Sequence, residues 1–339
     1  MFGHTFSAAD IPDLKGKVAI VTGANTGIGK VSSIELARSD RSFSLPVVSF
    51  FSFSPQADHV CVFCFLFFRH GAHVIMACRS AEKARPAVEE AIKVSGNQNV
   101  EFLPLDLSSL KSVAAFVEAF KAKNLPLHLL LNNAGVMACP FALTTDGIES
   151  QFGTNHIGHF YLTLLLFDLL EQNQPSRIVN VSSSAHNMAP SQGILFDSIN
   201  DEASYGAWKA YGQSKLANIL FTRELARRSE GKQIFINTLH PGVVETDLQR
   251  HMGGFSKWLI NRVSLTPEKG ALTQLYLSAH PDVEKNNIHG EFYVPTAKKS
   301  TSSSLSRDQK LAEKLWDFSV ALVKEKVGEF AVPDTLQNK

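Results

Sequence analysis

A glycine-rich turn directly after a buried strand is the feature that most constrains this 339-residue chain. The apolar run Lys17–Val21 reads as a strand, and TGANTGIG follows it, with Gly23, Gly27 and Gly29 at the turn into a helix. A pyrophosphate can approach backbone N–H groups and the positive end of a helix only where no Cβ intervenes. Glycines alone would also suit a plain turn, so the prediction of a dinucleotide site depends on the rest of the chain.

Short β-branched runs alternate with helix-length amphipathic segments along the chain, as in a parallel sheet wrapped by helices. Further strands are predicted at His73–Ala77, Val100–Pro104, Leu127–Leu131, Arg177–Val181, Ile234–Leu239 and Glu291–Val294. Helices are predicted at Ser108–Lys121, Gly147–Leu170, Ala210–Arg227, Pro267–Ser278 and Asp308–Lys326. The predicted fold is therefore α/β, with a Rossmann-type doubly wound parallel sheet in a single domain.

Charge and hydropathy argue against several classes of partner. The chain has 33 basic and 32 acidic residues, so its net charge of +1 gives no general reason to expect nucleic acid or an anionic membrane. The N-terminus lacks a secretory pattern, and the longest apolar runs are far shorter than the ~20 residues of a spanning helix. Four cysteines without a disulfide-like spacing fit a reducing compartment. We expect an intracellular protein, cytoplasmic or peripherally associated with a membrane.

Polar residues at the ends of later strands extend the predicted cofactor site. Asp106 follows the third strand, where a carboxylate can accept from an adenine amino group, and the run NNAG, Asn132–Gly135, ends the fourth. The second strand ends with Arg79 and no carboxylate. A guanidinium suits the 2′-phosphate of NADP, whereas an acidic residue would hold the 2′-hydroxyl of NAD. NADP(H) is thus preferred over NAD(H); a surface arginine that merely closes the strand is the alternative.

A Tyr-x-x-x-Lys pair supplies the predicted chemistry. Tyr211 and Lys215 lie four residues apart and so share one face of a helix, where the cation is expected to lower the pKa of the phenol. Ser183 follows a strand and can donate to a carbonyl oxygen. Asn155, on the preceding helix, is either a satisfied buried amide or holds a water that connects Lys215 to solvent, and we favour the second. No metal site is predicted.

Together these motifs, with the sequence HPG at His240–Gly242, resemble the short-chain dehydrogenase/reductase family. The longer stretches GANTGIGK, HVIMACRS, YGQSKLANILF and LHPGVVETDL are similar to its retinol dehydrogenase and WW-domain oxidoreductase branch. The resemblance implies that Tyr211 exchanges the proton, Lys215 holds the nicotinamide ribose, Ser183 orients the substrate and Asn155 completes a relay. The implied cofactor-binding residues are Gly23, Asn25, Thr26, Gly27, Ile28, Gly29, Arg79, Asp106, Leu107, Asn133, Ala134, Gly135, Tyr211, Lys215, Pro241, Gly242, Val244 and Thr246.

The resemblance predicts an NADP(H)-dependent oxidoreductase acting on a lipophilic aldehyde, ketone or alcohol, of which retinal or retinol is one example. Residues 247–263 are the predicted lid, and the segment between Ser183 and Tyr211 is expected to shape the substrate mouth. The alternatives are a regulator that binds NADP(H) without turnover and an interaction scaffold. Loss of the Tyr-x-x-x-Lys pair would mark the regulator, yet both residues are present.

One segment does not fit this pattern. Eight of the 24 Phe and two of the four Cys lie between Phe43 and Phe68, and Gly29 and Arg79 are 50 positions apart, where about 20 are expected. Removal of residues 39–69 restores that spacing, and the segment's codons can be pyrimidine-rich, so we predict a translated, unspliced intron. The alternatives are a genuine insertion, a membrane-touching loop or a zinc site at Cys61 and Cys64. The predicted organisation is a tail at 1–14, the NADP(H)-binding domain at 15–297, and a polar loop, helix and tail at 298–339.

Overall fold

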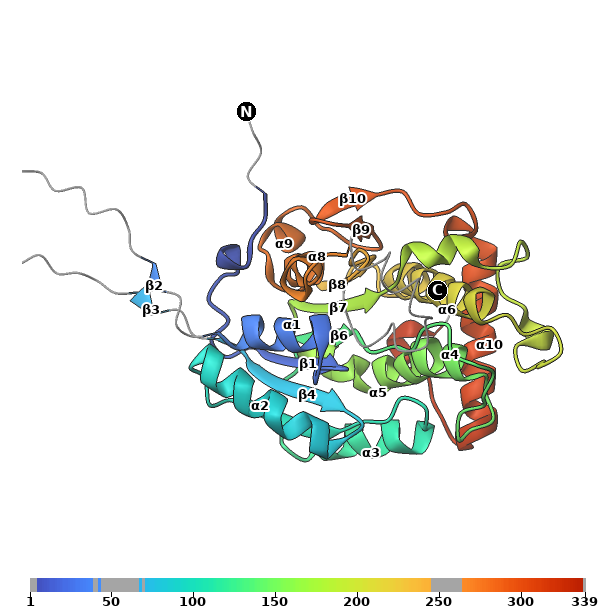
Figure 1. The fold of residues 1–339 in the computed structure, drawn as a ribbon, viewed down its shortest axis with the longest axis horizontal. Helices are drawn as coiled ribbons and strands as arrows, with labels where there is room; N and C mark the ends of the chain where they lie inside the picture. Colours follow the sequence, from blue (N-terminus) through green and yellow to red (C-terminus); the bar gives the residue numbers. More distant parts are fainter. Residues whose placement is uncertain (1–4, 39–41, 44–66, 69–70, 245–263, 338–339) are drawn as a thin grey trace, which may run out of the picture.

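The computed structural model describes residues 5–38, 42–43, 67–68, 71–244 and 264–337. Its main sheet has eight strands in the order β10-β9-β8-β7-β6-β1-β4-β5, all parallel except the edge strand β10 (Figure 1). These strands are β1 Val18–Thr22, β4 His73–Cys78, β5 Val100–Pro104, β6 Leu129–Asn132, β7 Ser176–Val181, β8 Ile234–Leu239, β9 Phe292–Val294 and β10 Lys298–Ser300. The predicted Rossmann-type, single-domain sheet is confirmed. The order in which strands are added reverses between β1 and β6, because β4 and β5 lie on one side of β1 and the strands from β6 onward lie on the other.

Helices cover both faces of the sheet (Figure 1). They are α1 Gly27–Ala37, α2 Ala81–Ser95, α3 Leu110–Lys121, α4 Ser150–Phe152, α5 Gly158–Gln172, α6 Ala207–Arg228, α8 Pro267–Ala279, α9 Asp282–Lys285 and α10 Gln309–Val327. Short 3-10 turns lie at Ala8–Asp10, Ser184–Met188, Phe196–Ser198, Leu305–Arg307 and Asp334–Leu336. Among the described residues, no helix is both long and apolar enough to cross a lipid bilayer.

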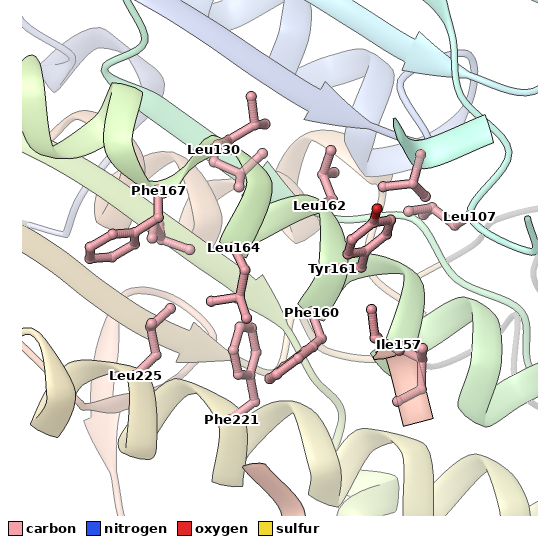
Figure 2. Close-up of a cluster of buried hydrophobic side chains, with 14 of the residues drawn as sticks. Leu107, Leu130, Ile157, Phe160, Tyr161, Leu162, Leu164, Phe167, Phe221 and Leu225 are labelled. Carbon is pink, nitrogen blue, oxygen red and sulfur yellow. The ribbon is translucent and has the colours of Figure 1, made fainter. Parts of the chain in front are cut away.

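Alternate residues of the central strands belong to two separate cores, as a pleated strand requires. In β1, Ile20 packs with α3, α5, α6 and α10, whereas Val21 packs with α1, α2 and α8. Figure 2 shows the first core, where Phe160 and Leu164 of α5 lie against Phe221 of α6. The Phe160 and Phe221 ring centroids are 5.2 Å apart. Because the central strands are buried on both faces, their positions in the sheet are fixed. The polar residues that follow their carboxyl ends are therefore held along one edge of the sheet.

Two sequence expectations differ from the structure. The predicted helix Gly147–Leu170 begins only at Ser150 and passes through a π-helical turn at Gly153–Ile157 before α5. The polar run from Lys298, predicted as a loop, contains β10, which pairs antiparallel with β9. Lys298 and Lys299 are exposed on this edge strand, so no apolar alternation marks it.

The end of α1 and the residues just before β4 lie next to each other. The Ala72 N–H donates to the Leu36 carbonyl at 2.9 Å, and the Asn97 side-chain amide donates to the carbonyls of Ala37 and Ala72 at 2.9 and 3.0 Å. A Cβ on Gly71 would lie 1.8 Å from the Ala37 carbonyl oxygen. The backbone at Ala37 is therefore in direct contact with the backbone at Gly71 and Ala72, although the two points are more than 30 residues apart in the sequence.

Most of the predicted intron segment, with Cys61 and Cys64, lies outside the described residues, so its origin stays a prediction. Within it, β2 (Ser42–Phe43) and β3 (Phe67–Phe68) form a separate antiparallel pair. Deletion of residues 39–69 is expected to keep the fold and NADPH-dependent turnover, because the ends already meet, and to raise solubility by removing apolar residues. Soluble yield, thermal unfolding and turnover measure this.

A longer deletion, of residues 39–72, is the matched control and is expected to unfold the protein, since it removes the contacts of Ala72. Insoluble protein after the shorter deletion would show that the segment is structural. Peptides from residues 44–66 in the mass spectrum of the native protein would refute the intron hypothesis but would not bear on whether the fold needs the segment.

Candidate active site

A cavity of about 560 Å³ runs along the carboxyl ends of the central parallel strands. The residues predicted from the sequence that line it are Gly23, Asn25, Thr26, Gly27, Ile28, Gly29, Arg79, Asp106, Leu107, Asn133, Ala134, Gly135, Ser183, Tyr211, Lys215, Pro241, Gly242 and Val244. Two predicted residues are not in this group: Asn155 lies behind the wall, and Thr246, like the predicted lid 247–263, lies outside the described residues.

The glycine turn forms a close-fitting wall at one end of the cavity. Gly23 and Gly27 have φ of +66° and +55°, which side chains rarely adopt. A Cβ on Gly29 would lie 2.5 Å from the Gly23 carbonyl oxygen. Helix α1 begins at Gly27 and has no acidic residue in its first turn. Its N–H groups and positive dipole therefore suit an anionic group such as a pyrophosphate.

Two cations lie at the end of the cavity next to β4. Arg79 directly follows β4 and is exposed, and Lys83 in the first turn of α2 lines the same cavity. Ser80 caps α2 by accepting from the Lys83 N–H at 3.3 Å, which fixes where that turn starts. No described carboxylate makes an ion pair with either cation. The sequence reasoning missed Lys83; its position four residues after Arg79, on a helix start, was the available signal.

Asp106 also lines the cavity, at the end of β5. Its Oδ1 accepts from the N–H and the hydroxyl of Ser108 at 3.0 and 2.6 Å. These bonds orient the carboxylate, as an acceptor for a ligand amino group requires.

Ser183, Tyr211 and Lys215 all line the cavity, and the Ser183 and Tyr211 side chains are hydrogen-bonded. Ser183 caps the turn after β7, where its Oγ accepts from the Ala185 N–H at 3.1 Å. Tyr211 and Lys215 come from α6, and Lys215 Nζ lies 5.7 Å from the Tyr211 ring centroid. Nζ donates to the Val181 carbonyl at 3.2 Å, which uses one of its three hydrogens.

Burial sets the pKa values of this group. Burial raises the pKa of Tyr211 to about 12, although a hydrogen bond from Ser183 lowers it in part. Burial lowers the pKa of Lys215 to about 8. The expectation that Lys215 would bring the Tyr211 pKa below its usual value is therefore wrong for this structure, because burial of the phenol has the largest effect and is opposed in part by the hydrogen bond from Ser183.

The side chain of Asn155 makes structural contacts. Its Oδ1 accepts from the Val136 N–H at 2.8 Å, and its Nδ2 donates to the Val136 carbonyl and to Ser214 Oγ, both at 2.9 Å. Both amide hydrogens are thus used, and the residue is fully buried. The satisfied-amide alternative describes this side chain, and our preference for a water-holding amide is not supported.

Apolar side chains surround the outer part of the cavity. Met188, Trp208 and Val243 line it and are 48%, 40% and 45% exposed. Met188 and Trp208 belong to the segment between Ser183 and Tyr211 that was expected to shape the mouth. Trp208 lies one helical turn before Tyr211, with the two rings edge to face at 6.2 Å. The sequence reasoning named none of these three residues, since an apolar side chain usually indicates core packing.

Comparisons with known proteins place the chain in a family. The family model for the short chain dehydrogenase matches residues 62–254. The chloroplastic short-chain dehydrogenase TIC 32 A of Brassica napus is 40% identical over 95% of this chain and 94% of its own. Human retinol dehydrogenase 11 is 40% identical over 91% of this chain and 86% of its own.

Solved structures show the same architecture. A crystal structure of an uncharacterized protein from Mycobacterium paratuberculosis has a TM-score of 0.69 and 33% identity, and it covers 95% of this chain and 98% of that chain. A short chain dehydrogenase from Shigella flexneri, complexed with NADP, has a TM-score of 0.59 at 20% identity, over 84% of this chain and 98% of that chain. This second likeness shows the fold alone.

Proposed function

Because this chain belongs to the short-chain dehydrogenase family, we propose that it is an NADP(H)-dependent oxidoreductase that interconverts the carbonyl and alcohol of a lipophilic small molecule. The observation that carries the proposal is the meeting of Ser183, Tyr211 and Lys215 in the cavity that the glycine turn also lines. The test is an assay of aldehydes and ketones with NADPH and NADH. No turnover of any carbonyl, despite tight NADPH binding, would favour the alternative of a regulatory NADP(H)-binding protein.

The chain's residues fit a nicotinamide dinucleotide. The glycine turn and the start of α1 would hold the pyrophosphate, Asp106 the adenine, Lys215 the nicotinamide ribose, and Pro241–Val244 would cover the nicotinamide. A Cβ on Gly135 would lie 3.1 Å from Asn155 Oδ1 and 3.4 Å from Lys215 Nζ, so a side chain there would be tightly packed against Asn155. When bound, the nicotinamide supplies the hydride.

The protein's part is proton transfer and orientation. With a pKa of about 12, Tyr211 is a neutral phenol at physiological pH and can donate its proton to the carbonyl oxygen. Ser183 bonds the same oxygen and so places the carbonyl beside the phenol. Lys215, still mostly protonated at pH 7 with its pKa of about 8, stabilises the phenolate that remains. This charge arrangement favours carbonyl reduction near neutral pH.

The preference for NADP(H) is assigned to Arg79 and Lys83. Arg79→Asp is expected to lower kcat/KM for NADPH by about tenfold to a hundredfold, and to raise it for NADH, because a carboxylate repels the 2′-phosphate and accepts from a 2′-hydroxyl. Steady-state kinetics with both cofactors measure the ratio. Arg85→Asp is the matched control, since Arg85 is an exposed residue of α2 outside the cavity lining. An unchanged ratio in Arg79→Asp would overturn the assignment.

The lipophilic substrate is inferred from the apolar rim and from relatives that are named retinol dehydrogenases. Trp208→Ala is expected to raise KM for a long-chain aldehyde about tenfold and to leave a short-chain aldehyde almost unaffected, because only the longer chain reaches the indole. Val94→Ala removes a comparably exposed apolar side chain outside the cavity lining and serves as the control. Equal changes for both aldehydes would contradict a role in substrate selection.

The location of the protein stays a prediction. We expect it inside the cell, in the cytoplasm or held peripherally at a membrane. Salt and carbonate extraction of cell membranes, followed by immunodetection, separates these two cases from an integral protein.

A further inference from the structure

His159 is a buried histidine beside the active site that the proposed chemistry does not use. It lies in α5, four residues after Asn155, and is 2% exposed. Its Nε2 is 2.9 Å from the hydroxyl oxygen of Thr22, at the end of β1. Its Nδ1 is 3.1 Å from the Asn155 carbonyl oxygen. One ring thus connects the strand before the glycine turn with the π-helical turn that carries Asn155.

The partners of the ring fix its protonation. A carbonyl oxygen only accepts, so Nδ1 carries the hydrogen. Burial lowers the pKa of His159 to about 4, with a smaller contribution from the charge of Lys215, so the ring is neutral at physiological pH. Nε2 is therefore an acceptor, and the Thr22 hydroxyl donates to it.

This donation orients the oxygen of Thr22. The hydroxyl accepts from the N–H groups of Asn133 and Ala134 at 2.9 and 3.0 Å, and these two residues line the cavity. A second possible acceptor for its hydrogen, the Leu131 carbonyl oxygen, is 3.4 Å away. If the hydrogen turned toward Leu131, the lone pairs would turn away from the two N–H groups. His159 thus selects the hydroxyl orientation that holds this wall.

The Nδ1 side of the His159 ring is connected to the same wall through Asn155. Asn155 Oδ1 accepts from the Val136 N–H, and a Cβ on Gly135 would lie 3.1 Å from that oxygen and 3.4 Å from Lys215 Nζ. The wall at Asn133–Val136 is therefore held by Thr22 at its start and by Asn155 at its end, and His159 bonds both.

We propose that His159 is a positioning residue that sets the wall Asn133–Val136 against the cofactor and against Lys215. The proposal rests on the proposed function for its kinetic consequences, but its hydrogen-bond pattern is measurable in the protein without ligand. His156 shows what an ordinary core histidine looks like here. It is as buried as His159, yet its Nε2 contacts Ser319 Oγ at 2.9 Å and its ring packs on Phe152, Phe160 and Phe221, away from the cavity.

Four variants test this role. His159→Phe keeps the ring shape without nitrogens, His159→Gln returns an acceptor for Thr22, Thr22→Val removes the hydroxyl, and His156→Phe is the control. We expect His159→Phe to weaken NADPH binding by about tenfold, the size of one typical net hydrogen bond, and to lower kcat, with little change in KM for the carbonyl. His159→Gln should recover most of the NADPH affinity. His156→Phe should lower the melting temperature without changing NADPH affinity.

A double variant and a spectrum complete the test. His159→Phe combined with Thr22→Val should lose no more NADPH affinity than Thr22→Val alone, because removal of the hydroxyl already removes the bond to His159 and the acceptor of both wall N–H groups. Additive losses, or equal effects of His159→Phe and His156→Phe on NADPH affinity, would overturn the proposal. In the ligand-free protein, ¹⁵N imidazole spectra should show His159, assigned by its absence from His159→Gln, as the Nδ1–H tautomer from pH 5 to 8. The other tautomer, or a titration in this range, would refute the proposed pattern even in a protein that proved not to be an NADPH enzyme.

Discussion

Tyr211→Phe is expected to lower kcat by about a thousandfold, with NADPH affinity within about twofold of wild type. The ring keeps its place beside Trp208 in the variant, while the group that we propose as proton donor to the carbonyl oxygen is removed. Burial holds the wild-type phenol protonated, so the loss should be similar across the neutral pH range. Single-turnover kinetics and fluorescence titration with NADPH separate the two quantities.

The control for this variant is Tyr205→Phe. Burial also raises the pKa of Tyr205 to about 12, but its hydroxyl donates to the Cys139 carbonyl at 2.7 Å and is not part of the cavity lining. Turnover should therefore persist in Tyr205→Phe. A kcat for Tyr211→Phe within tenfold of wild type would remove Tyr211 from the proposed mechanism.

Lys215→Met is expected to abolish turnover and to stabilise the fold at the same time. A pKa of about 8 instead of 10.5 corresponds to about 3 kcal/mol against the charged form, at about 1.4 kcal/mol per pKa unit. Methionine has a similar length and no charge, so the unfolding free energy at pH 7 should rise by about 1–3 kcal/mol. The lost bond to the Val181 carbonyl offsets part of the gain.

The sign of the pH dependence follows from the lowered pKa. Between pH 8 and 10.5 the unfolded chain binds more protons at Lys215 than the folded protein, so wild-type stability rises through this window as the penalty disappears. The advantage of Lys215→Met should shrink over the same range. Urea unfolding at pH 7 and pH 10, with the exposed Lys209→Met as control, measures both effects. A variant that is less stable than wild type at pH 7 would contradict the buried-charge explanation.

The fold was largely predictable because the central strands are short, mostly apolar runs rich in β-branched residues and buried on both faces. The strand β10 was not, since an exposed Lys-Lys-Ser edge carries no such pattern. Likewise, the π-helical turn at Gly153–Ile157 could not be told from an ordinary helix in the sequence; in the structure it carries Asn155, whose side chain bonds the backbone of Val136 twice.

The sequence allowed prediction of which residues line the cavity, but not of how burial changes the pKa values of Tyr211 and Lys215. Glycines, NNAG and the Tyr-x-x-x-Lys pair have fixed spacing, and the sheet brings them to one edge. Spacing places Lys215 beside Tyr211 but does not reveal how deeply both are buried, and burial decides the direction of both pKa shifts. The roles proposed for Lys83, Trp208 and His159 depend on which surface each residue faces, which only the folded chain shows.

The most direct test of the proposed function follows one deuterium atom. The protein would be incubated with a long-chain aldehyde and NADPH carrying deuterium at the transferred position of the nicotinamide, and the alcohol analysed by mass spectrometry and NMR. One deuterium on the former carbonyl carbon is expected, formed by wild type and not by Tyr211→Phe. An alcohol without deuterium, or no alcohol while NADPH stays bound, would contradict hydride transfer in this cavity.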